Sequence, residues 1–120
     1  MVVVISDYVE ETGTHTPSQI GVEETVWRYE SSAPAQIQGF LNTMNMVDED
    51  VIIIREYISF VHPVVYQLLT ERTLFGKQKE PLWLCKLLWV PRGYKITLTQ
   101  TIGSPKAYPY YFVIQKVERR

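Results

Sequence analysis

The sequence has little of the residue types that build catalytic, metal or disulfide sites. It contains one cysteine and two histidines in 120 residues. One cysteine excludes an internal disulfide, and these few, distant side chains are a poor supply of metal ligands. The glycines form neither a GxGxxG nor a Walker pattern, and Gly103-Ser104-Pro105 is not a nucleophile elbow because a proline follows the serine. The sequence therefore predicts a protein that is not an enzyme and has no cofactor or metal site.

Several features that could indicate chemistry have plainer explanations. Cys85 lies in an apolar segment without a nearby histidine or second cysteine, so we interpret it as a small buried residue. His62 precedes a proline, and a catalytic base would need a nucleophile that the sequence does not offer, so we expect His62 at a strand end. We expect His15 in an exposed loop. The acidic run 48–50 lacks the alternating ligands and the glycine of a calcium loop, which favours a solvated turn before a strand.

Long hydrophobic runs are also missing. Residues 1–5 are apolar, but they lack a basic flank and are soon followed by Asp7, which excludes a signal peptide and a membrane span. We therefore expect no membrane partner, and we interpret these residues as one short strand. Residues 10–19 are polar and rich in turn formers, so they predict a loop or a flexible arm. Apolar residues 2–5 ahead of this polar linker are compatible with an arm that adds a strand to a neighbouring subunit.

Charge is unevenly distributed along the chain, although the net charge is only −1. Residues 1–60 carry ten acidic and two basic side chains, whereas residues 61–120 carry ten basic and three acidic ones. If the two halves interleave in a sheet, these charges neutralise one another as cross-strand pairs. If they do not, the molecule has an acidic and a basic face, and head-to-tail contacts between copies become favourable.

The residues that are present indicate strands. Apolar residues make up 46% of the chain and charged ones 21%, as in a folded protein. Residues 94–101 alternate apolar and polar side chains, and residues 110–117 have the same β-rich composition. A glycine- and proline-containing loop, 103–109, separates them, so we predict an antiparallel hairpin that closes the domain.

Five further strands are expected upstream. Residues 64–75 fit either a helix or a strand, and two threonines favour a strand. Residues 51–60 form an apolar run typical of a central strand covered on both faces. In residues 82–90, alternation places Trp83 and Trp89 on the same face as Cys85. The remaining strands are 22–29, with Val22, Val26 and Trp27 as its buried residues, and 35–41, where Gly39 argues against a helix.

These elements predict an all-β fold, an antiparallel β-sandwich of about seven or eight strands, and a jelly roll is one form of such a sandwich. We divide the chain into an N-terminal arm or edge strand with a polar loop, residues 1–20, and a β-sandwich domain, residues 21–120.

A candidate binding surface lies around the last loop. Basic residues interleave with tyrosines there, as in sheets that bind single-stranded nucleic acid, but the negative net charge makes nucleic acid an unfavoured partner. Clustered tyrosines also stack on sugars or anchor protein interfaces, so carbohydrate remains an alternative partner. The residues proposed for this surface are Arg92, Lys106, Tyr108, Tyr110 and Tyr111, and the basic residues considered with them are Lys95 and Lys116.

Three runs, 39–46, 48–55 and 94–110, carry a family resemblance. Together they resemble small β-sandwich proteins encoded by phages and archaeal viruses, which have a strand, an Asn-Met turn, a Gly-Asp before a Val-Ile-Arg strand, and a Thr-Leu-X-Gln-Thr-X-Gly segment before an aromatic-proline loop. The match spans roughly residues 33–115. Glu49-Asp50 replaces the usual Gly-Asp, and the first twenty residues have no counterpart.

The matching motifs are turns and a core strand, so the resemblance implies a fold more than an activity. It implies a viral structural protein, a capsid, capsid-decoration or other virion component, located in the virion after assembly in the host cytoplasm. Its partners would be copies of itself and other virion proteins. The resemblance transfers no catalytic residues.

Overall fold

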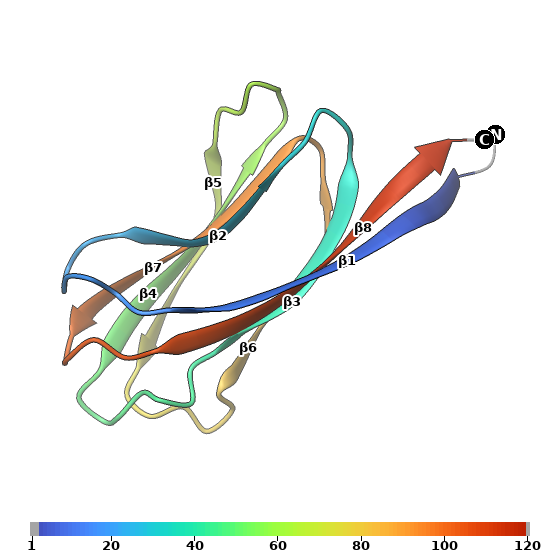
Figure 1. Cartoon of the computed structure of the whole chain (residues 1–120). Coiled ribbons are helices and arrows are strands. Elements are labelled where there is room, and N and C mark those ends of the chain that lie inside the picture. Colours follow the sequence, from blue (N-terminus) through green and yellow to red (C-terminus); the bar gives the residue numbers. More distant parts are fainter. Residues whose placement is uncertain (1–2, 120) are drawn as a thin grey trace.

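The part of the chain that the structure describes folds into eight antiparallel strands arranged as two four-stranded sheets (Figure 1). The computed structural model describes the backbone of residues 3–119 and the side chains of residues 9–85 and 89–116. Sheet A has the strand order β1-β8-β3-β6, and sheet B has the order β2-β7-β4-β5. The all-β sandwich predicted from the sequence is confirmed. The strands are β1 (Val3–His15), β2 (Glu24–Glu30), β3 (Ala35–Asn42), β4 (Val51–Ser59), β5 (Gln67–Phe75), β6 (Leu82–Val90), β7 (Gly93–Ile102) and β8 (Tyr108–Arg119).

Consecutive strands mostly lie in different sheets. Only the β4–β5 connection stays within one sheet, and the other six cross from one sheet to the other. The predicted hairpin of the last two strands is therefore wrong, although both strands exist. β7 pairs with β2 and β4, and β8 pairs with β1 and β3. Alternation shows which face of a strand is buried, but it does not identify the neighbouring strand.

The core lies between the two sheets. In β7 the side chains of Tyr94, Ile96 and Leu98 are buried at every second position, as the period of a strand requires. The indole of Trp27 in β2 stacks on the ring of Phe112 in β8, with centroids 4.3 Å apart. This aromatic pair joins sheet B to sheet A across the core.

Residues 35–41 and 64–75, for which a helix was also considered, both contain strands. β3 contains Gly39, and the ring of Phe112 lies so close to its Cα that a Cβ at this position would overlap the ring. The glycine therefore lets an aromatic side chain cover the strand. Within residues 64–75, the strand begins at Gln67, after a connection that includes a cis peptide bond before Pro63.

Two N-terminal predictions are wrong in detail. β1 continues to His15 because its backbone pairs with β8 as far as Tyr108, so residues 10–15 are strand and not loop. Val22, expected in the core, is 40% exposed because β2 begins only at Glu24. The predicted domain division at residue 20 stays a prediction.

Two predictions of burial are also corrected. β4 is a central strand, between β7 and β5, but only alternate side chains such as Ile52 and Ile54 are buried. Trp89 is 52% exposed and does not share the buried face of Cys85. β6 carries one extra residue opposite β3 between Cys85 and Leu88, and this bulge reverses the faces that follow it.

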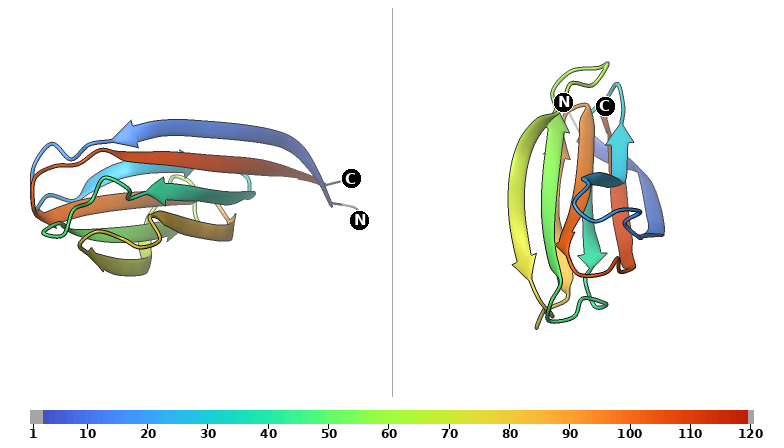
Figure 2. Two further views of the ribbon diagram at one scale, coloured as in Figure 1. Left: turned by 90° about the horizontal axis from the view of Figure 1, so that it is seen from below. Right: turned by 90° about the vertical axis from the view of Figure 1, so that its left-hand side faces the viewer.

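The N-terminal end of β1 and the C-terminal end of β8 pair as a two-stranded ribbon that extends beyond the two sheets (Figure 2). β8 pairs with β3 only as far as Lys116, whereas it pairs with β1 as far as Arg119. No helix long and apolar enough to cross a membrane occurs in the part of the chain that the structure describes.

Candidate functional site

The loop before β8 is held by a buried polar network. Tyr108 is 0% exposed, and its hydroxyl donates a hydrogen bond of 3.0 Å to Gln100 Oε1. Gln100 Nε2 donates in turn to the carbonyl of Ser104 at 2.7 Å. Burial raises the pKa of the Tyr108 hydroxyl, and the nearby Asp50 carboxylate adds to this effect. Tyr108 is therefore a structural residue, and its expected exposure on the candidate binding surface around the last loop is wrong.

Lys106 belongs to the same network. Its Nζ lies 3.3 Å from both carboxylate oxygens of Asp50, whose side chain is fully buried. Gly103, at a φ of 98°, passes so close that a Cβ there would overlap Asp50 Oδ1. The charge of Lys106 thus neutralises an internal carboxylate and ties the loop before β8 to the loop before β4.

Arg92 lies at the other end of the sandwich. It sits in the connection between β6 and β7, where its N–H donates to the Ser59 carbonyl at 3.1 Å and its own carbonyl accepts from Ser31 at 2.9 Å. The ten residues of β7 separate it from the tyrosines, a span of roughly 30 Å. The structure does not bring Arg92 together with the other predicted residues, and its role in an interface stays a prediction.

Tyr110 and Tyr111 are neighbours on β8 but have different surroundings. The ring of Tyr110 lies over Gly13 of β1 and 6.1 Å from the ring of Phe112, so it covers the edge of the core. Tyr111 pairs across the strands with Phe40 of β3, which pairs in turn with Leu84 of β6. Only Tyr111 therefore belongs to an aromatic cross-strand row on sheet A.

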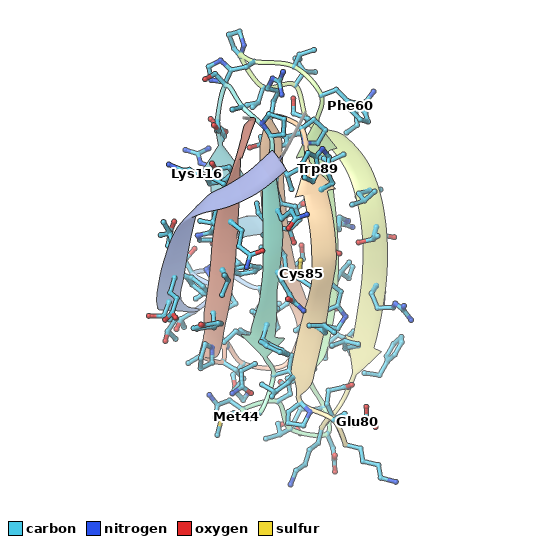
Figure 3. The ribbon with its side chains drawn as sticks, turned by 90° about the vertical axis from the view of Figure 1, so that its right-hand side faces the viewer. Met44, Phe60, Glu80, Cys85, Trp89 and Lys116 are labelled. Carbon is cyan, nitrogen blue, oxygen red and sulfur yellow. The ribbon has the colours of Figure 1, made fainter. Side chains whose placement is uncertain are left out.

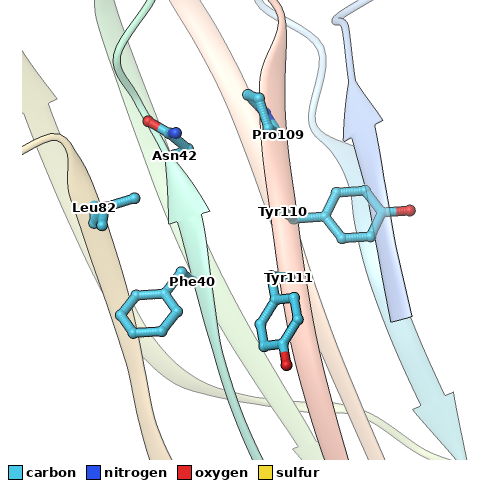
Figure 4. A pocket seen from close by; sticks show the side chains of 6 residues that line it. All are labelled: Phe40, Asn42, Leu82, Pro109, Tyr110 and Tyr111. Atoms are coloured by element: carbon cyan, nitrogen blue, oxygen red, sulfur yellow. The ribbon is translucent and has the colours of Figure 1, made fainter. Parts of the chain in front are cut away.

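This row borders a shallow depression of about 200 Å³, which we call the outer patch (Figure 4). Sequence reasoning missed four of its residues. One signal was available: in a strand, alternation places Phe40 on the face opposite Ile37 and Leu41, which the structure buries. The outer patch is lined by Phe40, Asn42, Leu82, Pro109, Tyr110 and Tyr111, none of which carries a charge.

A second surface is the side of the sandwich formed by β5 and β6, which we call the open edge (Figure 3). Every residue of β5 except Leu74 is exposed, and Leu68 and Leu69 are 56% and 43% exposed. β5 is therefore poorly covered on both faces. Further exposed apolar side chains on these strands are Phe75, Leu82, Leu84 and Trp89.

A cleft of about 220 Å³ lies along the open edge and contains a buried carboxylate. Glu56 accepts hydrogen bonds from the hydroxyl groups of Tyr94, at 2.5 Å, and Thr70, at 2.8 Å. Cys85 Sγ lies 3.1 Å from the Tyr94 hydroxyl. The cleft is lined by Glu56, Thr70, Arg72, Trp83 and Leu84.

These ionisable groups do not supply a nucleophile. Burial raises the pKa of the Cys85 thiol, and the negative charge of Glu56 raises it further. Burial also raises the pKa of the Tyr94 phenol. Both groups are therefore protonated at neutral pH, and they act as hydrogen-bonding core residues. Among the described side chains, no three His, Cys, Asp or Glu residues come together as metal ligands would.

The basic residues that interleave with tyrosines do not form one groove. Lys95 of β7 lies over the rings of Tyr57 and Tyr66, at 4.7 and 4.8 Å from their centroids, on sheet B. Lys116 lies on β8 in sheet A. The pattern that suggested a nucleic-acid surface is divided between the two sheets because β7 and β8 are not a hairpin.

No protein-family model and no curated protein sequence matches the chain. Solved structures match it by shape. The VP2 subviral particle protein of infectious bursal disease virus matches with a TM-score of 0.51 and 11% identity, over 92% of this chain and 32% of that chain. A Bacillus endospore appendage protein, from disulfide-linked pili, matches with a TM-score of 0.52 and 10% identity, over 94% of this chain and 92% of that chain.

At these identities the similarity shows a common fold. The chain spans about a third of the viral protein it matches and nearly all of the appendage protein. Both neighbours are structural proteins of larger assemblies, a viral particle and a pilus. The resemblance to viral structural proteins thus agrees with the fold, whereas the assignment to phages or archaeal viruses stays a prediction.

Proposed function

We propose that the protein is a structural subunit that assembles with copies of itself and with other proteins of a virion, as a capsid or capsid-decoration component. The observation that carries this proposal is the open edge, where apolar side chains are exposed along β5 and along β6. Monomeric proteins rarely leave large contiguous apolar surfaces in water, and such surfaces mark sites of protein contact.

The backbone of the open edge supports the same function. β5 and β6 are the last strands of their sheets, so each has one side without a partner strand among the residues that the structure describes. Unpaired N–H and C=O groups on edge strands readily pair with another chain. An apolar surface that also offers ladder hydrogen bonds is suited to permanent association.

The strand order supports a capsid-type fold. Sheets of the order β1-β8-β3-β6 and β2-β7-β4-β5, joined mainly by crossing connections, are arranged as in a jelly roll of eight strands. Jelly rolls are common among capsid domains and lectins. We infer that this chain is a jelly roll used for assembly.

The burial of Cys85 favours an assembly whose subunits are not linked by disulfides. The matched appendage protein comes from disulfide-linked pili. In this chain the one cysteine is buried beside Tyr94, and burial raises the pKa of its thiol. A disulfide between copies through Cys85 would require the core to open.

Sedimentation of open-edge variants tests the proposal. We expect the wild-type protein to associate with increasing concentration, and Leu68→Thr with Leu84→Thr to shift it toward the monomer, because threonine suits a strand but removes apolar contact. Met44→Gln, in the exposed loop between β3 and β4, is the matched control and should behave like the wild type. A wild-type protein that stays monomeric at all concentrations would contradict the proposed function.

A second candidate function is carbohydrate binding at the outer patch. Phe40 and Tyr111 are cross-strand neighbours on an uncharged surface, and Asn42 supplies an amide at its border. Aromatic faces with a nearby amide suit sugar rings. A glycan array tests it: binding lost in Phe40→Ala and Tyr111→Ala supports this function, and no binding by the wild type rejects it.

A further inference from the structure

We infer that the partner of the open edge is the opposite side of a second copy, formed by β1 and β2, which we call the acidic edge. This inference rests on the proposed self-assembly and specifies its geometry. β1 and β2 are the other terminal strands of sheets A and B, and both have an unpaired side. In this arrangement each sheet of one copy continues directly into the corresponding sheet of the next.

Strand direction allows this continuation. All neighbouring strands are antiparallel, so β1 and β6, at opposite ends of a four-stranded sheet, run in opposite directions. The same holds for β2 and β5 in sheet B. A second copy placed beside the first in the same orientation therefore offers β1 antiparallel to β6 and β2 antiparallel to β5. Antiparallel ladders of this kind are favourable.

Charge complementarity selects this partner. By sequence, residues 3–30 contain six acidic side chains and one basic one, whereas residues 67–90 contain four basic and two acidic ones. Arg72 lines the cleft of the open edge, and Lys77 and Lys79 are exposed at its end. Positive charges disfavour the pairing of two open edges with each other, and they favour contact with the acidic edge.

The side-chain rows agree with the same contact. One cross-strand row of sheet A runs from Thr12 through Tyr111 and Phe40 to Leu84. Thr12 and Thr14 are exposed on β1, and they are short, uncharged neighbours for the exposed leucines of β6. β1 is also longer than β6, with 13 residues against nine, so it can pair with all of β6.

The contact is heterologous, because different surfaces of the two copies meet. Such contacts build a ring when the rotation between copies closes and a filament when it does not. Each subunit in the assembly then uses one open edge and one acidic edge, and only the terminal subunits of a filament keep a free edge.

Two charge variants test the inference by sedimentation velocity. Thr12→Lys with Thr14→Lys adds two positive charges to the acidic edge, and Lys77→Glu with Lys79→Glu reverses the charge at the open edge. Each should weaken self-association about tenfold or more, because like charges then face each other. Ser32→Lys with Ala33→Lys, in the exposed connection between β2 and β3, adds the same charge as the first variant and should associate like the wild type.

Mixing the two variants gives the decisive result. Each keeps one intact edge, so a mixture should form a one-to-one complex that neither variant forms alone. If the wild type associates but Thr12→Lys with Thr14→Lys associates equally well, this inference is overturned while self-assembly stands. If the wild type does not associate, the proposed function fails and this inference fails with it. Circular dichroism of each variant should show the wild-type β spectrum, so that lost association reflects the edge and not unfolding.

Discussion

Trp27 stacks on Phe112 with an angle of 6° between the ring planes, and this contact joins the two sheets across the core. Trp27 also donates a hydrogen bond from Nε1 to Glu11 Oε1, at 3.1 Å, so one side chain connects β2 with both β8 and β1. Because β1 and β2 form the acidic edge, the position of that edge depends on this pair.

Replacing the buried indole should cost much of the stability. We expect Trp27→Ala to lower the free energy of unfolding by about 3–5 kcal/mol, because it leaves a cavity beside Phe112 and removes the stack. Trp89→Ala is the control, because its half-exposed side chain should cost less than about 1 kcal/mol. Urea unfolding measures both values, and equal losses would contradict the described core.

Gly103 should be far less replaceable than Gly21, although both have positive φ. Alanine at either position is strained by about 1 kcal/mol or more. At Gly21 a Cβ would meet nothing within 4 Å, whereas at Gly103 it would overlap the buried carboxylate of Asp50. Thermal unfolding should therefore show a clearly larger loss for Gly103→Ala than for Gly21→Ala. Similar losses would mean that Asp50 does not occupy this space.

Glu23 should contribute to the loss of stability in acid. Burial alone would raise its pKa, but hydrogen bonds from Thr97, at 2.6 Å, and Tyr57, at 2.5 Å, and the charge of Arg55 outweigh burial and lower it below 4.5. The stabilising contribution is therefore complete above pH 4.5 and is lost as the pH falls through the lower folded-state pKa. In urea titrations Glu23→Gln should be less stable than the wild type at pH 7, and this difference should shrink in acid. A constant difference would argue against the ionised contact.

Cys85 should be unreactive in the folded protein. Burial and the neighbouring Glu56 raise the pKa of its thiol, so little thiolate is available to react. A thiol-reactive dye at pH 8 should label the wild type only after urea is added. Leu82→Cys places a thiol at an exposed position of the same strand and should react at once. Rapid labelling of the folded wild type would show that the open edge gives access to the core.

The strands could be predicted from the sequence because the pattern of apolar and polar residues along β3, β4 and β7 indicates an extended, half-buried segment. The pairing of the strands could not be predicted, because the sequence patterns around Tyr94 and Tyr111 are the same whether β7 and β8 form a hairpin or lie in different sheets. The burial of Tyr108 depends on Gln100 as a hydrogen-bond acceptor, and that contact exists only in the folded chain. The exposure of Trp89 depends on a bulge that alternation does not reveal. The outer patch and the open edge arise from strand order, so they could not be read from single segments.

Hydrogen–deuterium exchange at low and high protein concentration tests self-assembly through the open edge most directly, because it reports on backbone amides of individual strands. We predict that amides of β5 and β6, and of β1 and β2, exchange more slowly at high concentration, while those of central strands β4 and β8 do not change. Unchanged exchange along β5 and β6 at every concentration would contradict the account.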